Sequence, residues 1–217
     1  MILDIYTKYC SGAKGIASKD NAIVAYVSPK CGLTSIKYLT ALTYEPVVTQ
    51  DFVSLDYLKG RAEYRMSRDA AGTKLAVIRD PVSRFVSGYK HVVLNNNDLA
   101  PIMDTPPTFD EFVANFDSYN AQLKALDSTA PNIQIEFHFS PQVNCVGSDP
   151  TKFDYVYDLE ADTDAIFALY DAQYGKTFPR VHLNSTDNGQ PITPTQAQVD
   201  WIKAKYADDY AVWFSNK

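Results

Sequence analysis

The fold of this 217-residue chain is decided by residues 22–35, whose sequence is AIVAYVSPKCGLTS. The first six of these residues form an uninterrupted apolar run, which is typical of a strand buried on both faces of a sheet. The polar residues 28–32 then predict a tight turn, and residues 33–42 predict a helix. A buried strand, a turn and a helix in this order begin an α/β unit.

The turn at residues 28–32 has the composition of an anion-binding site. The N-terminus of a helix presents unpaired backbone N–H groups and about half a positive charge from the helix dipole. Gly32 lets the backbone approach a bound group closely, and Lys30 adds a full positive charge. The hydroxyl groups of Thr34 and Ser35 add further donors. A phosphate or a sulfate is therefore the expected ligand.

The turn differs from a Walker A loop, in which the lysine follows the second glycine. Lys30 comes before Gly32, and no aspartate at a strand end stands out as a ligand for Mg²⁺. We therefore expect an anion site that works without a metal, which argues against an ATPase or a GTPase.

A second strand-to-helix turn is predicted at residues 79–89, RDPVSRFVSGY, directly after another apolar run. Asp80 is expected to cap the helix, and Pro81 suits its first turn. Arg79 can bind a phosphate in bidentate fashion. Ser87 lies two helical turns after Asp80 and adds a hydroxyl group. This segment therefore predicts a second site for an anionic group.

The charge around this second turn indicates the kind of ligand. Residues 74–90 contain four basic residues and one acidic residue, although the whole chain has a net charge of −6. A basic segment of this size in an acidic protein suggests a small polyanionic ligand rather than a nucleic acid.

The composition is that of a single globular domain over residues 1–217, since 46% of the residues are hydrophobic and 21% are charged. No apolar run reaches the roughly 20 residues of a membrane-spanning helix, and the first residues are too acidic for a signal peptide. The three cysteines predict neither a disulfide framework nor a zinc site. The sequence therefore predicts a soluble cytoplasmic protein with reduced thiols, although a trimmed luminal fragment would share these features.

Predicted strands alternate with predicted helices, which indicates a mainly parallel sheet with helices on both faces. Such sheets bind ligands at the carboxyl ends of their strands, where both turns lie. Further predicted elements are a helix over residues 53–71, a helix from a capping box at Thr108 and Glu111 to Phe116, and a buried strand over Tyr155–Leu159. Two more helices are predicted near the C-terminus. One covers Asp162–Tyr174 and is ended by Gly175, and the last opens at residues 193–196, with Pro194 at its first position and Gln196 at its third.

The two turns together resemble the cofactor site of the sulfotransferases that use 3′-phosphoadenosine-5′-phosphosulfate (PAPS). A third stretch, HFSPQ at residues 138–142, is followed by Cys145 and by FDYVYDLE at residues 153–160. It is similar to the pattern of Golgi-type carbohydrate sulfotransferases (sulfotransferase family 2). The resemblance runs from about Asn21 to the C-terminus. It implies an α/β, P-loop-like three-layer fold, in which helices flank a central, mainly parallel sheet.

The resemblance also assigns roles to the residues of both turns. The loop that binds the 5′-phosphosulfate consists of Lys30, Cys31, Gly32, Leu33, Thr34 and Ser35. Leu33 stands where the family pattern has a hydroxyl residue. Arg79 and Ser87 are expected to bind the 3′-phosphate. Lys30 is expected to stabilise the oxygen that leaves the sulfur atom, and no metal is implied.

The acceptor hydroxyl needs a general base, and His138 is the preferred candidate. Residues 133–139 alternate between apolar and polar side chains, which predicts a strand with His138 on its polar face. Glu136 on that face could orient the imidazole. His91 and Arg84 are candidates for substrate binding, although Arg84 could instead buttress its helix through an ion pair. The alternative bases are the carboxylates of Asp51, Asp56 and Glu63.

These observations predict an enzyme that transfers a sulfuryl group from PAPS to a hydroxyl acceptor by in-line displacement. A carbohydrate is the preferred acceptor, and a small metabolite, a lipid or a peptide tyrosine is the alternative. The product would be adenosine 3′,5′-bisphosphate. The rival classes are a Mg²⁺-dependent nucleotide phosphotransferase and a non-catalytic module that binds the nucleotide. The sequence predicts no nucleic-acid partner and no membrane span, and it leaves the oligomeric state open.

Overall fold

The computed structural model describes residues 15–44, 66–67, 71–126, 130–180 and 191–215, with the backbone alone at 66–67 and 130–134. Contacts divide the chain into two compact units. The sheet unit comprises Gly12–Arg79 and Gln142–Ser185, and the helical unit comprises Met1–Ser11, Asp80–Pro141 and Thr186–Lys217. Each unit has a hydrophobic core of its own. The prediction of one domain over residues 1–217 stays a prediction.

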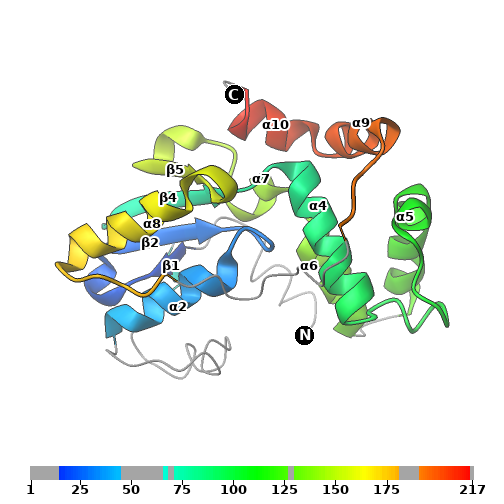
Figure 1. Ribbon diagram of the computed structural model, residues 1–217, viewed down its shortest axis with the longest axis horizontal. Coiled ribbons are helices and arrows are strands. Elements are labelled where there is room, and N and C mark those ends of the chain that lie inside the picture. The colour runs from blue at the N-terminus through cyan, green and yellow to red at the C-terminus, as the bar shows by residue number, and fades with distance from the viewer. Residues whose placement is uncertain (1–14, 45–65, 68–70, 127–129, 181–190, 216–217) are drawn as a thin grey trace. The chain divides into compact units, whose positions relative to one another are not determined.

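The described part of the sheet unit contains five strands in the order β3-β1-β2-β4-β5, of which Figure 1 labels β1, β2, β4 and β5. Their bounds are β1 Gly15–Ala17, β2 Ile23–Val27, β3 Met66–Ser67, β4 Thr73–Ile78 and β5 Tyr155–Asp158. Strands β2, β4 and β5 run parallel, whereas the short strands β1 and β3 pair antiparallel. The predicted α/β class with a mainly parallel central sheet is confirmed.

The two predicted strands that precede the anion turns lie side by side in this sheet. β2 pairs with β4 in a register that places Val27 opposite Val77. Because these strands are parallel, their carboxyl ends meet at one end of the sheet. The turn after β2 therefore begins close to Arg79, which follows β4. Both strands are buried, as their apolar runs predicted, with exposed fractions of at most 1% over Ile23–Ala25 and Leu75–Ile78.

Helices α2 and α8 pack on one face of this sheet (Figure 1). The described helices and 3₁₀ turns of the sheet unit are α2 Leu33–Tyr44, α7 Gln142–Cys145, α8 Leu159–Tyr174, η1 Lys19–Asn21 and η4 Pro150–Lys152. The core combines alternate residues of β2 and β4 with residues of α2 and α8, among them Ile23, Leu75, Leu39 and Tyr170. This packing fixes the direction in which α2 leaves the turn at residues 28–32.

Helix α8 begins earlier than the sequence predicted. The side chain of Asp158 accepts a hydrogen bond from the Glu160 N–H (3.1 Å), so the helix begins at Leu159 rather than at Asp162. It ends before Gly175, whose φ of 61° makes it the left-handed cap that was predicted. The early start places Glu160 in the first turn of the helix.

Two other predictions for the sheet unit need correction. β5 is one of the two edge strands of the described sheet, and its Tyr155 and Val156 are 43% and 39% exposed. The prediction of a buried strand there is therefore wrong. The predicted helix over residues 53–71 lies largely outside the described residues, and Met66–Ser67 form strand β3 instead.

The helical unit contains the segment with Ser87 and the segment with His138. Its described elements are α4 Pro81–Tyr89, the π-helical turn η3 Lys90–Asn95, α5 Phe109–Ala125, α6 Ala130–Phe139, α9 Gln196–Lys205 and α10 Ala207–Trp213. The predicted capping box at Thr108 and Glu111 is confirmed, and the helix that it opens continues beyond the predicted end at Phe116. The last predicted helix begins two residues later than predicted, at Gln196, because Thr195 caps it in a capping box with Gln198. It is divided into α9 and α10.

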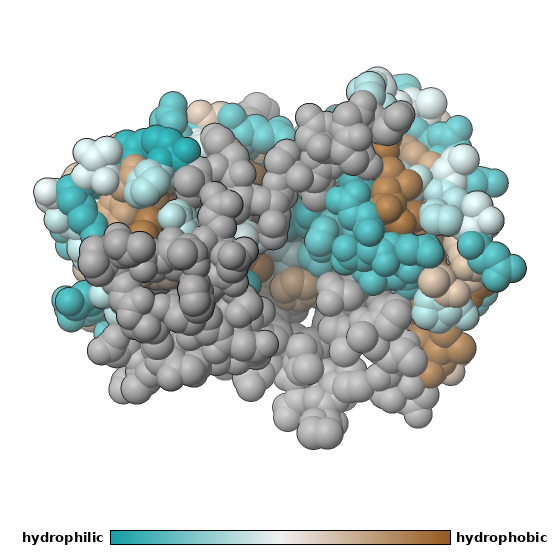
Figure 2. Space-filling model, turned by 60° about the horizontal axis from the view of Figure 1, so that its bottom comes forward, coloured by the Kyte–Doolittle hydropathy of each residue, from teal (hydrophilic) through white to brown (hydrophobic). Residues whose placement is uncertain are grey.

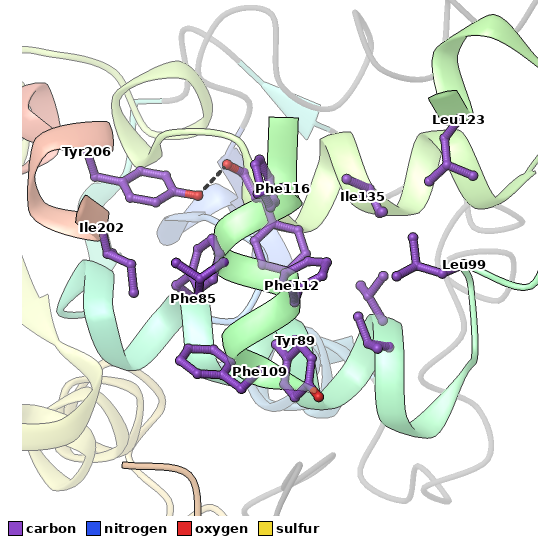
Figure 3. Packing of buried hydrophobic residues seen from close by; sticks show 14 residues of the cluster. Phe85, Tyr89, Leu99, Phe109, Phe112, Phe116, Leu123, Ile135, Ile202 and Tyr206 are labelled. Carbon is purple, nitrogen blue, oxygen red and sulfur yellow. Dashed lines mark hydrogen bonds between the residues drawn. The ribbon is translucent and has the colours of Figure 1, made fainter. Parts of the chain in front are cut away.

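Aromatic side chains fill the core of the helical unit (Figure 3). The ring of Phe85 on α4 lies 4.9 Å from that of Phe139 and 5.5 Å from that of Phe116, measured between centroids. Tyr206 is 1% exposed, and its hydroxyl donates a hydrogen bond to the Phe139 carbonyl (2.8 Å; Figure 3). These contacts fix the end of α6, next to His138.

The prediction of a strand over residues 133–139 is wrong, because these residues belong to α6. Ile135 and Phe139 are both buried in the aromatic core. They are four residues apart, so the alternating pattern fits one face of a helix as well as a strand. The aromatic core decides between the two patterns in favour of the helix.

On the face of the molecule shown in Figure 2, the described hydrophobic residues form small groups among hydrophilic ones. Within the part of the chain that the structure describes, no helix is both long enough and apolar enough to cross a membrane.

Candidate functional site

The predicted anion turn begins at Ser28, whose carbonyl accepts a hydrogen bond from the Cys31 N–H (3.1 Å). Pro29 occupies the second position of this turn and Lys30 the third, where φ is +67°. Proline at the second position and a positive φ at the third are features of a type II turn, whose third residue is usually glycine. Lys30 therefore has a backbone conformation that costs about 1–2 kcal/mol for a residue with a Cβ atom.

Gly32 completes the change of direction from strand to helix. Its φ is +75°, and a Cβ atom there would lie 2.7 Å from a methyl carbon of Leu159. Its carbonyl accepts the Ile36 N–H (3.0 Å), a hydrogen bond that opens α2. Residues 33–35 form the first turn of that helix and are partly exposed. The predicted loop residues thus lie at a helix N-terminus, where an anion binds favourably.

The amine of Lys30 loses its proton more readily in this position than in water. Its pKa is lowered from 10.5 to about 8, mainly by burial and also by the positive charge of Arg79, whereas Cys31 acts in the opposite direction. A bound anion would favour the charged amine. The electrostatics of the turn therefore fit an anionic ligand.

Arg79 connects the end of β4 with this turn. Its Nη1 donates a hydrogen bond to the Lys30 carbonyl (3.3 Å). Its Nε and Nη2 lie 2.9 and 2.8 Å from Oε1 of Glu160 in the first turn of α8. The structure thus brings two predicted site residues, Lys30 and Arg79, into direct contact.

Gln142 and Glu160 belong to this site but were not among the predicted site residues. Gln142 is fully buried, and its side chain contacts Arg79 and Cys31, which precede it by 63 and 111 residues. Contacts between residues so far apart in sequence do not affect the local pattern of apolar and polar residues. The signal in the sequence was the position of both residues in the third stretch, which resembles the sulfotransferase pattern.

Asp80 caps helix α4 in the helical unit, as predicted. Its Oδ1 accepts a hydrogen bond from the Ser83 N–H (2.9 Å), and its Oδ2 accepts one from the Tyr210 hydroxyl (2.8 Å). Pro81 is the first residue of the helix. Ser87 lies in the same helix and is 7% exposed.

Arg84 on α4 is fully buried. Its guanidinium donates to the Ser140 carbonyl and lies 5.8 Å from the ring centroid of Tyr206. These contacts favour a supporting role in the helical unit over the predicted contact with substrate. The carbonyl of Ser140 gives part of that support, and the ion pair proposed above stays a prediction.

The candidate base, His138, lies near the end of α6 and is 8% exposed. The centroid of its ring lies 4.8 Å from that of His91, and the rings meet edge to face at 67°. His91 belongs to the π-helical turn η3, a rare conformation that often occurs at functional sites. Glu136 pairs with Lys124 (2.6 Å), so the described contacts do not support the expectation that it orients His138. Two predicted residues, His91 and His138, are nevertheless neighbours.

The alternative bases, Asp51, Asp56 and Glu63, lie outside the described residues. Among the residues that the structure does describe, no group of three or more His, Cys, Asp or Glu side chains could hold a metal ion.

Comparison with known families agrees with this geometry. The sequence pattern of the sulfotransferase family matches residues 15–212. The chain therefore belongs to the sulfotransferase family, and the resemblance noted in the sequence is confirmed. No curated protein and no solved structure matches the chain significantly.

The positive φ of Lys30 predicts that Lys30→Gly is more stable than Lys30→Ala. Both substitutions remove the amine, so their difference measures the cost of a Cβ atom at this φ. We expect a difference of about 1 kcal/mol in the free energy of unfolding, measured with urea. At the exposed Lys203 of α9, the order should be reversed, because glycine destabilises a helix interior. Equal stability of the two Lys30 variants would contradict the strain.

Proposed function

We propose that this sulfotransferase moves a sulfuryl group from PAPS to a hydroxyl group of a carbohydrate. The observation that carries the proposal is the turn at Lys30: a partly buried lysine, held at a positive φ beside Arg79, at the N-terminus of α2. Backbone strain at a charged residue is common where a site is organised for a ligand. Membership of the sulfotransferase family supports sulfuryl transfer as the reaction.

In the proposed reaction, the acceptor oxygen attacks the sulfur atom while the bond between sulfur and the bridging phosphate oxygen breaks. The charged amine of Lys30 would stabilise the negative charge that develops on the bridging oxygen. The N–H groups at the start of α2 would bind the other oxygens of the transferred group. The acceptor proton would pass to a base, for which His138 is our candidate. The products are a sulfate ester and adenosine 3′,5′-bisphosphate.

Arg79 and Ser87 keep their predicted role at the 3′-phosphate as part of the proposal. The carboxylate of Glu160, which pairs with Arg79, is 47% exposed. A pair this exposed contributes only about 0–1 kcal/mol to stability. A doubly charged phosphate could therefore replace Glu160 as the partner of Arg79 at small cost.

The carbohydrate acceptor rests on the third stretch, which is similar to the pattern of the Golgi-type carbohydrate enzymes. A panel of acceptors that includes carbohydrates, small phenols, lipids and tyrosine peptides, with radiolabelled PAPS in the presence of EDTA, tests both parts of the proposal. We expect label in a carbohydrate product without added metal. Binding of the nucleotide without transfer to any acceptor would instead indicate a non-catalytic relative, and a Mg²⁺ requirement with ATP would indicate a phosphotransferase.

Arg79→Ala should weaken binding of adenosine 3′,5′-bisphosphate by about 10- to 100-fold, as expected for the loss of a charge-assisted hydrogen bond to phosphate. Calorimetry measures the affinity directly. Arg180→Ala is the matched control, because Arg180 also pairs with a carboxylate, that of Asp171, in the same unit. An unchanged affinity of the Arg79 variant would remove Arg79 from the nucleotide site.

The affinity for adenosine 3′,5′-bisphosphate should fall as the pH rises through about 8, the pKa of Lys30. The anionic ligand favours the protonated amine, so the protonated form that predominates below this pH binds more tightly. The fall cannot exceed about tenfold per pH unit for one coupled proton. The Lys30→Met variant should bind more weakly and show no such fall between pH 7 and 9.5. The same pH dependence in both proteins would show that another group titrates.

His138→Ala should lower kcat by about 10²–10⁴-fold, the usual contribution of a positioned base, with little change in affinity for the bisphosphate. Because His138 is nearly buried, the free energy of unfolding of the variant must be measured alongside its turnover. A folded variant with turnover close to that of the unsubstituted enzyme would exclude His138 and favour a carboxylate such as Asp51, Asp56 or Glu63.

A further inference from the structure

Gln142 connects the anion turn with the end of β4 through a single side-chain amide. Its Oε1 accepts hydrogen bonds from the Arg79 N–H (3.0 Å) and from the Cys31 thiol (3.1 Å). Its Nε2 donates to the Arg79 carbonyl (2.9 Å). Gln142 is fully buried, as is Cys31. The amide therefore satisfies three polar groups in a place where unpaired ones would be costly.

The contacts of Gln142 extend the pairing of β4 beyond its last residue. The strand ends at Ile78, which lies opposite Asp158 of β5. At the next residue, Arg79, the side-chain amide of Gln142 forms hydrogen bonds with both the backbone N–H and the backbone carbonyl, as a neighbouring strand would. Glutamine suits this place because its amide both donates and accepts. A glutamate would keep the acceptor and lose the donor, and a leucine would lose both.

Both residues that Gln142 contacts, Arg79 and Cys31, are neighbours of Lys30. The side chain of Arg79 donates to the Lys30 carbonyl, and Cys31 is the next residue in the chain. The backbone of Lys30 is strained, with a φ of +67°, and such a conformation persists only where several contacts impose it. Gln142 contributes to two of these contacts, since it fixes the peptide of Arg79 and the thiol of Cys31.

We propose that Gln142 is a positioning residue, which holds the turn of residues 28–32 against the end of β4 in the conformation that binds the sulfuryl donor. That this conformation binds the sulfuryl donor rests on the proposed function, whereas the claim that Gln142 holds the turn does not. Gln142 acts through Arg79 and Cys31 rather than by touching the reacting atoms. Its substitution should therefore raise KM for the donor more than it lowers kcat at saturating donor.

The test compares Gln142→Leu and Gln142→Glu with Gln173→Leu, a control at an exposed glutamine on α8 in the same unit. The first measurement is the rate at which iodoacetamide alkylates Cys31, followed by peptide mass spectrometry. It needs no assumption about function. We expect about a tenfold faster reaction in Gln142→Leu, since the turn opens more often when these hydrogen bonds are lost.

The second measurement is the affinity for adenosine 3′,5′-bisphosphate by calorimetry. We expect Gln142→Leu to bind about 10- to 100-fold more weakly and Gln142→Glu to bind less weakly than that, with no change for Gln173→Leu. If Gln142→Leu does not fold, Gln142→Met replaces it in both measurements, since methionine is close to glutamine in size and lacks the amide that pairs with Arg79 and Cys31.

Each outcome bears on a separate statement. Unchanged alkylation of Cys31 in Gln142→Leu would overturn the positioning role, whatever the function of the protein. Faster alkylation with unchanged affinity would show that the position of the turn does not govern donor binding, and it would overturn the proposal too. If the unsubstituted protein binds no bisphosphate, the proposed function fails, while the alkylation rates still decide whether Gln142 holds the turn.

Discussion

The parallel pairing of β2 with β4 is the constraint on which the rest of the site depends. With Val27 opposite Val77, the chain leaves both strands at the same end of the sheet. Lys30 and Arg79 are 49 residues apart in sequence, yet this register brings the guanidinium of one to the carbonyl of the other. A shift of register by one residue would reverse the faces of every side chain in the strand, so the buried apolar residues that fix the register also fix the site.

The turn between β2 and α2 departs from the conformation that its sequence would choose locally. A lysine at positive φ and a partly buried amine both cost free energy in the folded state. Three contacts with the surrounding structure hold the turn in this conformation. They are the packing of α2 on the sheet, the guanidinium of Arg79 and the buried amide of Gln142. A bound anion would offset the second of these costs, because it favours the charged form of the amine.

The sequence predicted the features of this protein that follow from local rules. Apolar runs located β2 and β4, Asp80 and Thr108 marked the starts of two helices, and Gly175 marked the end of a third. The failures are of another kind. The pattern of residues 133–139 fits a strand and a helix equally well, and only packing in the aromatic core determines that they form a helix. The apolar residues of β5 predicted a buried strand, although β5 lies at an edge of the described sheet. The residues of the turn were found, whereas Gln142 acts across 63 and 111 residues of sequence and could be recognised only from a family pattern.

The charges around the turn also bear on which anion it could hold. Two cationic side chains, those of Lys30 and Arg79, lie close enough for one to lower the pKa of the other. Glu160 offsets part of this repulsion through Arg79. An anion that approaches Arg79 competes with a carboxylate already in contact, whereas one that approaches Lys30 meets an amine whose burial has removed much of its hydration.

A singly charged ligand would gain little at Arg79, because it would only replace the carboxylate of Glu160 with another singly charged partner. A ligand with a doubly charged group gains more there, and a second anionic group on the same molecule gains again at Lys30. These charges therefore support our proposal of a ligand with two anionic groups rather than a simple monoanion.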